Sequence, residues 1–142
     1  MSFLFFIFSL LVPKTNYCSC LPLGPIDEKQ FKEYDLIVKA KVIKIIVHNF
    51  ERTIYLSVDT YYKGDNEQKT IEISTPDRES ICGITPAVNE VWLIFAYLLD
   101  QNYETSLCTR TKNMNPKAWN YNKNEIDSDL KFLEAKIRNT NH

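Results

Sequence analysis

Apolar and polar residues alternate over much of the chain, and this alternation predicts a domain built mainly of β-strands. Every second residue from Leu36 to Val42 is apolar, as expected for a strand with one buried face. The alternation stops at residues 43–47, where a β-bulge would let a long strand turn from one face of a barrel to another. Four further strands are predicted at residues 53–62, 70–74, 90–98 and 103–109. The strand at 90–98 is apolar on both faces, which is typical of a strand covered on each side.

The segments between the strands carry turn signals. Lys63-Gly64-Asp65-Asn66 is a turn signal after the second strand, and residues 75–88 are predicted to form a loop that carries Cys82-Gly83. Gly64 and Gly83 are both expected at positions that need a positive φ.

Two segments carry helix signals. A short helix is predicted at residues 27–34, with the Asp27 side chain capping its first turn. Near the end of the chain, Leu130, Leu133 and Ile137 recur at spacings of three and four residues. This spacing predicts an amphipathic helix that begins at an Asn or Asp cap between residues 124 and 127. Five strands, these helices and the lack of strand–helix–strand alternation indicate a mainly β fold, a small five-stranded barrel of the OB type.

The N-terminal residues have the composition of an export signal. Residues 3–12 form an uncharged apolar run, much shorter than the roughly 20 residues that a membrane-spanning helix needs. We therefore expect residues 1–17 to be a removed signal peptide and residues 18–142 to form one secreted domain without a stable membrane span. No Lys or Arg precedes the run, however, and Tyr17 stands where a small residue usually precedes the cleavage site. Cleavage directly before Cys18 and cleavage elsewhere therefore remain alternatives.

Charge and histidine content narrow the classes of function. The chain has 17 Lys and Arg residues against 18 Asp and Glu residues, so no basic surface for nucleic acid is indicated. Its histidines are His48 and His142, and no Ser-His-Asp, Cys-His or HExxH arrangement can be assembled around them. We therefore expect a protein that is not an enzyme and that uses no cofactor.

Four cysteines, Cys18, Cys20, Cys82 and Cys108, are the remaining candidates for chemistry. Four cysteines allow three disulfide pairings, and disulfides are the expected state in an exported protein. A structural zinc site is the alternative. Zinc ligands usually come as cysteine pairs separated by two to four residues, whereas one residue separates the closest pair here. The spacing therefore favours disulfides.

Six segments of the chain, which open with Cys18-Ser19-Cys20-Leu21-Pro22 and include Cys82-Gly83, together resemble the N-terminal domain of the tissue inhibitors of metalloproteinases. The six segments are residues 18–22, 35–42, 61–64, 75–83, 92–96 and 107–108. The likeness runs from Cys18 to about Lys112. Related netrin-like modules of extracellular proteins share most of this pattern, so the resemblance identifies the fold better than the activity. The third N-domain disulfide of that family has no counterpart in this sequence.

The resemblance implies a fold, two disulfides and a mode of action. The fold would be a netrin-like barrel of the OB type, and the bonds would be Cys18–Cys82 and Cys20–Cys108. The protein would act as a monomeric inhibitor of zinc metalloproteinases and would have no metal of its own. The α-amino nitrogen and carbonyl oxygen of an N-terminal Cys18 would chelate the enzyme's catalytic zinc, and Ser19 would enter the enzyme's specificity pocket. The other residues expected to contact the enzyme's cleft are Cys20, Leu21, Pro22, Ser80 and Ile81.

A second hypothesis explains the same residues without inhibition. The chain would be a netrin-like extracellular binding module that engages a protein partner through its barrel surface, and its cysteines would be structural only. The two hypotheses differ in what they require of the mature N-terminus, because inhibition needs a free α-amine on Cys18.

Overall fold

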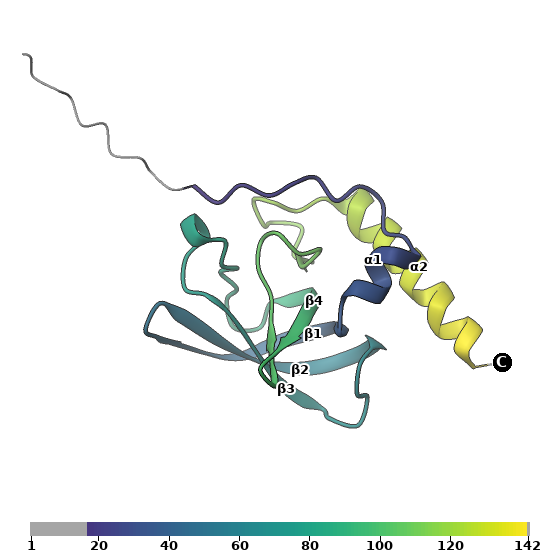
Figure 1. Ribbon diagram of the computed structural model, residues 1–142, viewed down its shortest axis with the longest axis horizontal. Helices are drawn as coiled ribbons and strands as arrows, with labels where there is room; N and C mark the ends of the chain where they lie inside the picture. The colour runs from purple at the N-terminus through teal and green to yellow at the C-terminus, as the bar shows by residue number, and fades with distance from the viewer. Residues whose placement is uncertain (1–16, 142) are drawn as a thin grey trace, which may run out of the picture.

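The structure, a computed structural model, describes residues 17–141 and is mainly β (Figure 1). Its elements in chain order are α1 (Glu28–Glu33), β1 (Leu36–His48), β2 (Glu51–Lys63), β3 (Thr70–Pro76), the 3₁₀ turn η1 (Glu79–Ile81), β4 (Val91–Leu99), β5 (Asn102–Glu104), β6 (Lys112–Asn113) and α2 (Lys123–Thr140). Residues 1–16 and 142 lie outside the described part of the chain, so the predicted export signal remains a prediction. Among residues 17–141, no helix is both long and apolar enough to cross a membrane.

Five of the strands described close into a ring. The order of hydrogen-bonded neighbours is β1-β2-β3-β5-β4-β6, and β1 also pairs with β4, which joins the two sides of the sheet. β3 and β5 run parallel, whereas all the other pairs are antiparallel. The sequence predicted five strands, and the structure adds β6, whose two residues pair with Trp92 and Leu93 of β4. A strand of two residues is too short to show a periodic pattern.

β1 belongs to two sides of the ring. Residues 36–41 pair with β4, and residues 37–48 pair with β2. The register with β2 shifts between Val42 and Lys44, so the predicted bulge is confirmed. Because a bulge bends the strand that carries it, β1 can leave β4 and continue with β2 as a hairpin (Figure 1).

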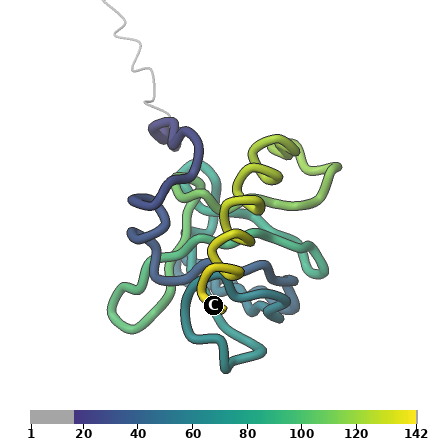
Figure 2. The backbone as a smooth tube through the Cα atoms, turned by 90° about the vertical axis from the view of Figure 1, so that its right-hand side faces the viewer, coloured from purple at the N-terminus to yellow at the C-terminus, as the bar shows by residue number. Residues whose placement is uncertain are grey.

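One apolar core lies inside the ring and a second lies outside it. The inner core takes alternate residues of β1 to β4, among them Val38 and Ile94. The outer core joins Leu93 and Phe95 to Leu133 of α2, which runs along the outside of the strands (Figure 2). Neighbouring residues of β4 thus lie in different cores, which confirms that this strand is covered on both faces.

Two predicted boundaries are wrong. The cap of α1 is Asp27, as predicted, but the cap of α2 is Asn122, whose side chain accepts a hydrogen bond from the Glu125 N–H at 3.2 Å. Several Asn and Asp residues lie close together there, and each is a good cap. The fifth strand ends at Glu104 and does not reach Cys108. Residues 105–111 form a loop instead, and this loop is hydrogen-bonded to β4 through the side chains of Thr105 and Thr111.

Candidate functional site

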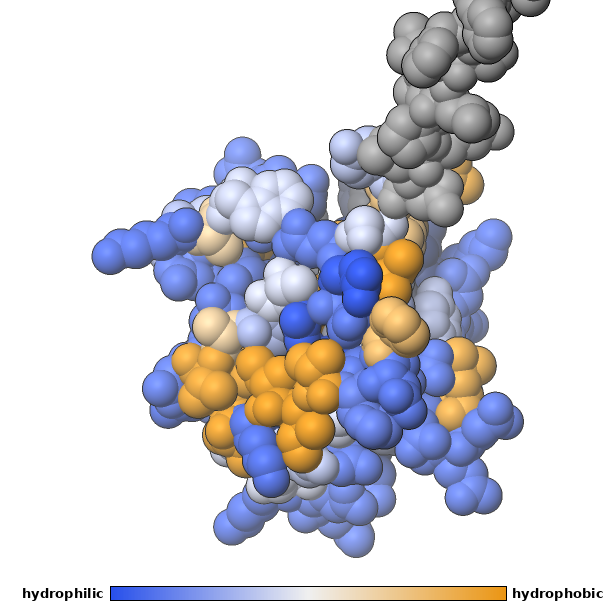
Figure 3. Space-filling model, turned by 90° about the vertical axis from the view of Figure 1, so that its left-hand side faces the viewer, coloured by the Kyte–Doolittle hydropathy of each residue, from blue (hydrophilic) through white to orange (hydrophobic). Residues whose placement is uncertain are grey.

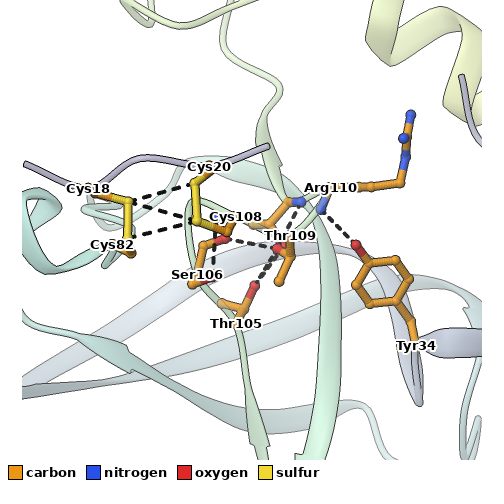
Figure 4. Close-up of a disulfide and its surroundings, with 10 residues drawn as sticks. Cys18, Cys20, Tyr34, Cys82, Thr105, Ser106, Cys108, Thr109 and Arg110 are labelled. Atoms are coloured by element: carbon orange, nitrogen blue, oxygen red, sulfur yellow. Dashed lines mark hydrogen bonds between the residues drawn. A yellow bond between two sulfur atoms is a disulfide. The ribbon is translucent and has the colours of Figure 1, made fainter. Parts of the chain in front are cut away.

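Two disulfides fasten the N-terminal segment to two separate loops beside the ring (Figure 4). Cys18 is bonded to Cys82 and Cys20 to Cys108, the pairing that the family resemblance implies. The bonded Cα atoms are 5.0 and 5.1 Å apart, within the usual range for disulfides. Residues 18 and 20 are therefore both fixed to the body of the protein.

The segment between the disulfides and α1 is open to solvent. Residues 17–24 have no regular secondary structure, and Pro22 lacks the N–H that a helix or an inner strand would require. Leu21 is 87% exposed, Ser19 and Pro22 are also exposed, and Cys18 is partly buried. The side chains at 19, 21 and 22 are thus available to a partner.

The loop that holds Cys82 adds two more exposed residues. Cys82 follows η1 directly and has a left-handed backbone with φ 69°. Its N–H donates to the Glu79 carbonyl oxygen at 3.0 Å, which fixes this conformation. Ser80 and Ile81 are exposed on the turn just before it, so the Cys18–Cys82 bond brings them close to Cys18. We call residues 18–22 together with Ser80 and Ile81 the N-terminal edge.

Gly83 is required for a reason that differs from the prediction. Among the glycines with positive φ are Gly24 and Gly64, but not Gly83. A Cβ atom at Gly83 would lie only 1.9 Å from the carbonyl oxygen of Pro76, so only glycine fits. The expectation of positive φ is therefore confirmed for Gly64 and wrong for Gly83.

Buried threonines brace the loop that holds Cys108. The hydroxyl oxygens of Thr105 and Thr111 are 2.7 Å apart, and each lies within 3.0 Å of the Phe95 carbonyl oxygen. The Phe95 N–H donates to Thr111 Oγ1 at 2.9 Å. The loop is thereby hydrogen-bonded to β4 through side chains. These hydrogen bonds therefore hold the loop that carries Cys108 in place.

A buried arginine joins the N-terminal segment to both helices. Arg110 is 3% exposed and donates to the Asp129 carboxylate, with 2.5 Å between Nη2 and Oδ1. It also donates to the carbonyl oxygen of Gly24 and to Oε1 of Gln30, both at 2.8 Å. Lys112 places a second cation 3.1 Å from Asp129 Oδ2. This cluster fixes the far end of the N-terminal segment, four residues beyond Cys20.

The sequence predictions missed this cluster, although one signal was present. Asp129 lies three residues after Ile126 and four before Leu133, on the apolar face of α2. A carboxylate on such a face needs a buried cationic or hydrogen-bonding partner. The sequence alone does not show that Arg110 is that partner, because the residues are far apart along the chain.

Several ionisable groups near the site have shifted pKa values. Burial, and next the neighbouring Tyr97, raise the pKa of Tyr34, whose hydroxyl oxygen accepts the Arg110 N–H at 3.2 Å. Beside the N-terminal edge, the Arg78 hydrogen bond lowers the pKa of Asp77. The Arg78–Asp77 pair lies at the surface, where ion pairs contribute little to stability.

The cysteines are also the one potential metal-binding group found in residues 17–141. No other set of three or more His, Cys, Asp or Glu side chains in that part of the chain is close enough to share an ion. His48 lies exposed at the end of β1, and His142 is outside the described residues. With both disulfides formed, the sulfur atoms are occupied in bonds to each other.

No model of a known protein family matches the chain, and no curated protein matches it. The likeness to the tissue inhibitors of metalloproteinases therefore remains a prediction from the sequence.

Proposed function

We propose that the protein is a secreted inhibitor of zinc metalloendopeptidases, and that the N-terminal Cys18 chelates the catalytic zinc of its target. The observation that carries the proposal is the double attachment of the N-terminal edge. Two disulfides, one residue apart, hold a segment whose intervening side chain, Ser19, is exposed.

The chemistry requires a free α-amine at Cys18. A catalytic zinc ion keeps one coordination position for water or substrate. The α-amino nitrogen and carbonyl oxygen of one residue form a five-membered chelate that can displace this water. The amine must be unprotonated to bind, and an α-amine with a pKa of about 7.7–8.0 loses its proton readily near neutral pH.

Rigidity explains why such a short segment could bind tightly. Ordering a flexible residue costs about 1–2 kcal/mol of backbone entropy. Residues 18 and 20 are ordered before the enzyme arrives, so this cost is largely avoided on binding. In the proposed complex Ser19 enters the specificity pocket. Cys20, Leu21 and Pro22 continue along the cleft, and Ser80 and Ile81 lie on its other side.

The proposal extends to the fold and to the whole chain. The ring order β1-β2-β3-β5-β4 with β3 parallel to β5 supports a five-stranded OB-type, netrin-like barrel. Residues 18–142 would form this domain after the signal is removed, and it would act as a monomer without enzymatic activity, cofactor or metal of its own.

The decisive experiment adds one alanine before Cys18. Oxidised protein beginning at Cys18 and the Ala-extended form are compared against a panel of zinc endopeptidases. The extension converts the amine to an amide and removes the chelate. Losing only an outer-shell partner of a metal ligand costs about 10- to 100-fold in affinity, so the inhibition constant should rise at least about 100-fold. The thermal midpoint should stay the same, because the position before Cys18 is exposed.

A matched control keeps the amine and changes the neighbouring side chain. Ser19→Ala should alter the inhibition constant by less than about tenfold, or about 1.4 kcal/mol, because it removes only a hydroxyl group. If correctly bonded protein beginning at Cys18 inhibits no enzyme of the panel, the proposal fails. Mass spectrometry of the exported protein then shows whether Cys18 is the natural N-terminus.

A binding module is the second candidate, and an exposed apolar surface favours it. The β1–β2 hairpin exposes Ile43, Ile46, Val47 and Phe50, the last with 71% of its surface accessible. The side of the molecule on which this hairpin lies shows a gathering of apolar side chains (Figure 3). Contiguous exposed apolar surface often marks a protein interface. If the protein with alanine added before Cys18 no longer inhibits proteases but still binds a protein partner, that result would favour this second function.

A further inference from the structure

The two disulfides lie against each other, so all four sulfur atoms form one compact group (Figure 4). The Sγ atom of Cys18 is 3.7 Å from that of Cys20 and 3.8 Å from that of Cys108. The Sγ atoms of Cys82 and Cys108 are also 3.8 Å apart, although they belong to different disulfides. All four Sγ atoms lie within 4.8 Å of one another.

These separations match the dimensions of a tetrahedral zinc site. With Zn–S distances of about 2.3 Å, the sulfur atoms of a tetrahedral tetrathiolate site are about 3.8 Å apart. Three of the contacts between the two disulfides already have this length. The sulfur atoms that are bonded to each other would have to separate, and the remaining pair, Cys20 and Cys82, already lies within 4.8 Å.

We propose that the chain has a second, reduced state in which Cys18, Cys20, Cys82 and Cys108 bind one zinc ion as a tetrathiolate site. Each disulfide takes up two electrons and two protons from a dithiol, which is itself oxidised to a disulfide. The four thiols then release four protons as they bind Zn²⁺, and the resulting centre carries two negative charges. Structural zinc sites of the four-cysteine type have the same composition.

Two of the four cysteines, Cys82 and Cys108, lie on loops that are also held by hydrogen bonds. Cys82 is fixed by its hydrogen bond to Glu79, and the Cys108 loop is fixed by the buried threonines on β4. Cys18 and Cys20 lie two residues apart, and the 3.7 Å between their Sγ atoms shows that both side chains point to the same side. The Arg110 hydrogen bond to Gly24 keeps the rest of that segment near the loops.

The sulfur atoms can also be reached. Cys20 is exposed and the other three cysteines are partly buried, so a reductant and a metal ion can approach from solvent. The C-x-C spacing, which favours disulfides over zinc when the sequence is considered alone, is no obstacle here, because all four sulfur atoms lie within 4.8 Å of one another.

The test uses the whole domain, residues 18–142, reduced with a phosphine. A phosphine performs the same two-electron reduction and forms its oxide with oxygen from water, without adding a competing dithiol. Reduced protein should bind one Zn²⁺ per chain, and Co²⁺ in its place should give the visible absorption typical of four thiolates in a tetrahedron. The oxidised protein should bind neither ion.

Two matched variants each remove one disulfide pair, Cys18→Ser with Cys82→Ser and Cys20→Ser with Cys108→Ser. Each leaves two cysteines, so the reduced variants should bind zinc at least roughly 100-fold more weakly than the reduced wild type. Equal affinity in the wild type and both variants would overturn the proposal.

If reduction unfolds the chain, circular dichroism still tests the proposal, because it shows whether Zn²⁺ restores the fold. Return of a cooperative thermal transition on addition of Zn²⁺ supports the site, because metal binding then drives folding. Zinc binding by a chain that stays unfolded overturns it. These measurements use reduced protein and no protease, whereas inhibition is tested with oxidised protein. The zinc site and the inhibitory function can therefore fail independently of each other.

Discussion

The carbonyl oxygen of Pro76 determines which residue can follow Cys82. It occupies the position where a side chain at residue 83 would begin. The Gly83 N–H also donates to the Arg78 carbonyl oxygen at 3.0 Å, so the close approach is part of the loop's hydrogen bonding. The position of Cys82, and hence that of Cys18, depends on this contact.

Gly83→Ala should therefore destabilise the protein strongly, by about 3 kcal/mol or more, since overpacking against backbone cannot be relieved by a rotamer change. Gly24→Ala is the matched control. Gly24 has φ 64° but no atom within 4 Å of the added Cβ, so that variant should lose only about 1–2 kcal/mol. Urea unfolding measures both, and equal losses would show that the Pro76 contact is not tight in solution.

Tyr34 makes stability sensitive to alkaline pH. Burial raises its pKa in the folded protein, whereas the unfolded chain loses the tyrosine proton at about pH 10. The unfolded state then binds fewer protons than the folded state, so stability is fully present below about pH 10 and falls above it. Urea unfolding between about pH 8 and about pH 11 should show this loss, and Tyr34→Phe should make it shallower. An equally steep loss in Tyr34→Phe would assign it to other groups, such as Tyr61 and Tyr62, whose pKa values are also raised by burial.

At the scale of elements, the buried ion pair between Arg110 and Asp129 decides how the helices and the N-terminal segment meet. Arg110 lies just before β6, and Asp129 lies in the second turn of α2. Because Arg110 also binds Gly24 and Gln30, the pair connects the N-terminal segment and α1 to α2.

Asp129→Asn should cost about 3–5 kcal/mol, because it leaves the buried Arg110 charge without its counterion. Asp127→Asn is the matched control on the same helix. Asp127 is paired with Lys123 at the surface, so its loss should change stability by about 0.5 kcal/mol or less. Chemical unfolding of the two variants compares them directly. A loss in Asp129→Asn as small as that in the control would mean that Arg110 finds another partner or water.

The elements that the sequence revealed are those with a long periodic pattern. β1, β2 and α2 repeat their apolar residues often enough for the period to be read, and even the bulge after Val42 interrupts a clear alternation. The end of β5 and the whole of β6 could not be predicted in this way. Their boundaries depend on which hydrogen bonds Thr105 and Thr111 make with β4, and these bonds join residues distant in sequence.

At the scale of the whole molecule, the disulfide pairing shows what a sequence can and cannot supply. Spacing alone allowed three pairings, and the family resemblance selected the one that the structure contains. The exposure of Ser80 and Ile81 depends on how the loop before Gly83 folds, which no local pattern encodes. The contact between the two disulfides is likewise a property of the folded chain, because Cys82 and Cys108 come together from separate loops.

Removing the disulfides one at a time separates their contributions to stability from their contributions to the proposed inhibition. The bonds span 64 and 88 residues, so each variant should lose at most about 4–5 kcal/mol of stability in the chain-entropy model. Serine at positions 18 and 82 keeps an N-terminal amine but frees two residues, whose ordering costs about 2–4 kcal/mol. The inhibition constant should then rise about 30- to 1000-fold.

Serine at positions 20 and 108 should affect inhibition much less. That variant keeps Cys18 bonded to Cys82, so the chelating residue stays fixed while the segment after it gains freedom only as far as Gly24, which Arg110 still holds. We expect a loss of about tenfold or less, or about 1.4 kcal/mol. Both variants are compared at a temperature at which circular dichroism shows them folded. An equal loss of inhibition in the two folded variants would mean that the attachment of Cys18 itself does not position the amine.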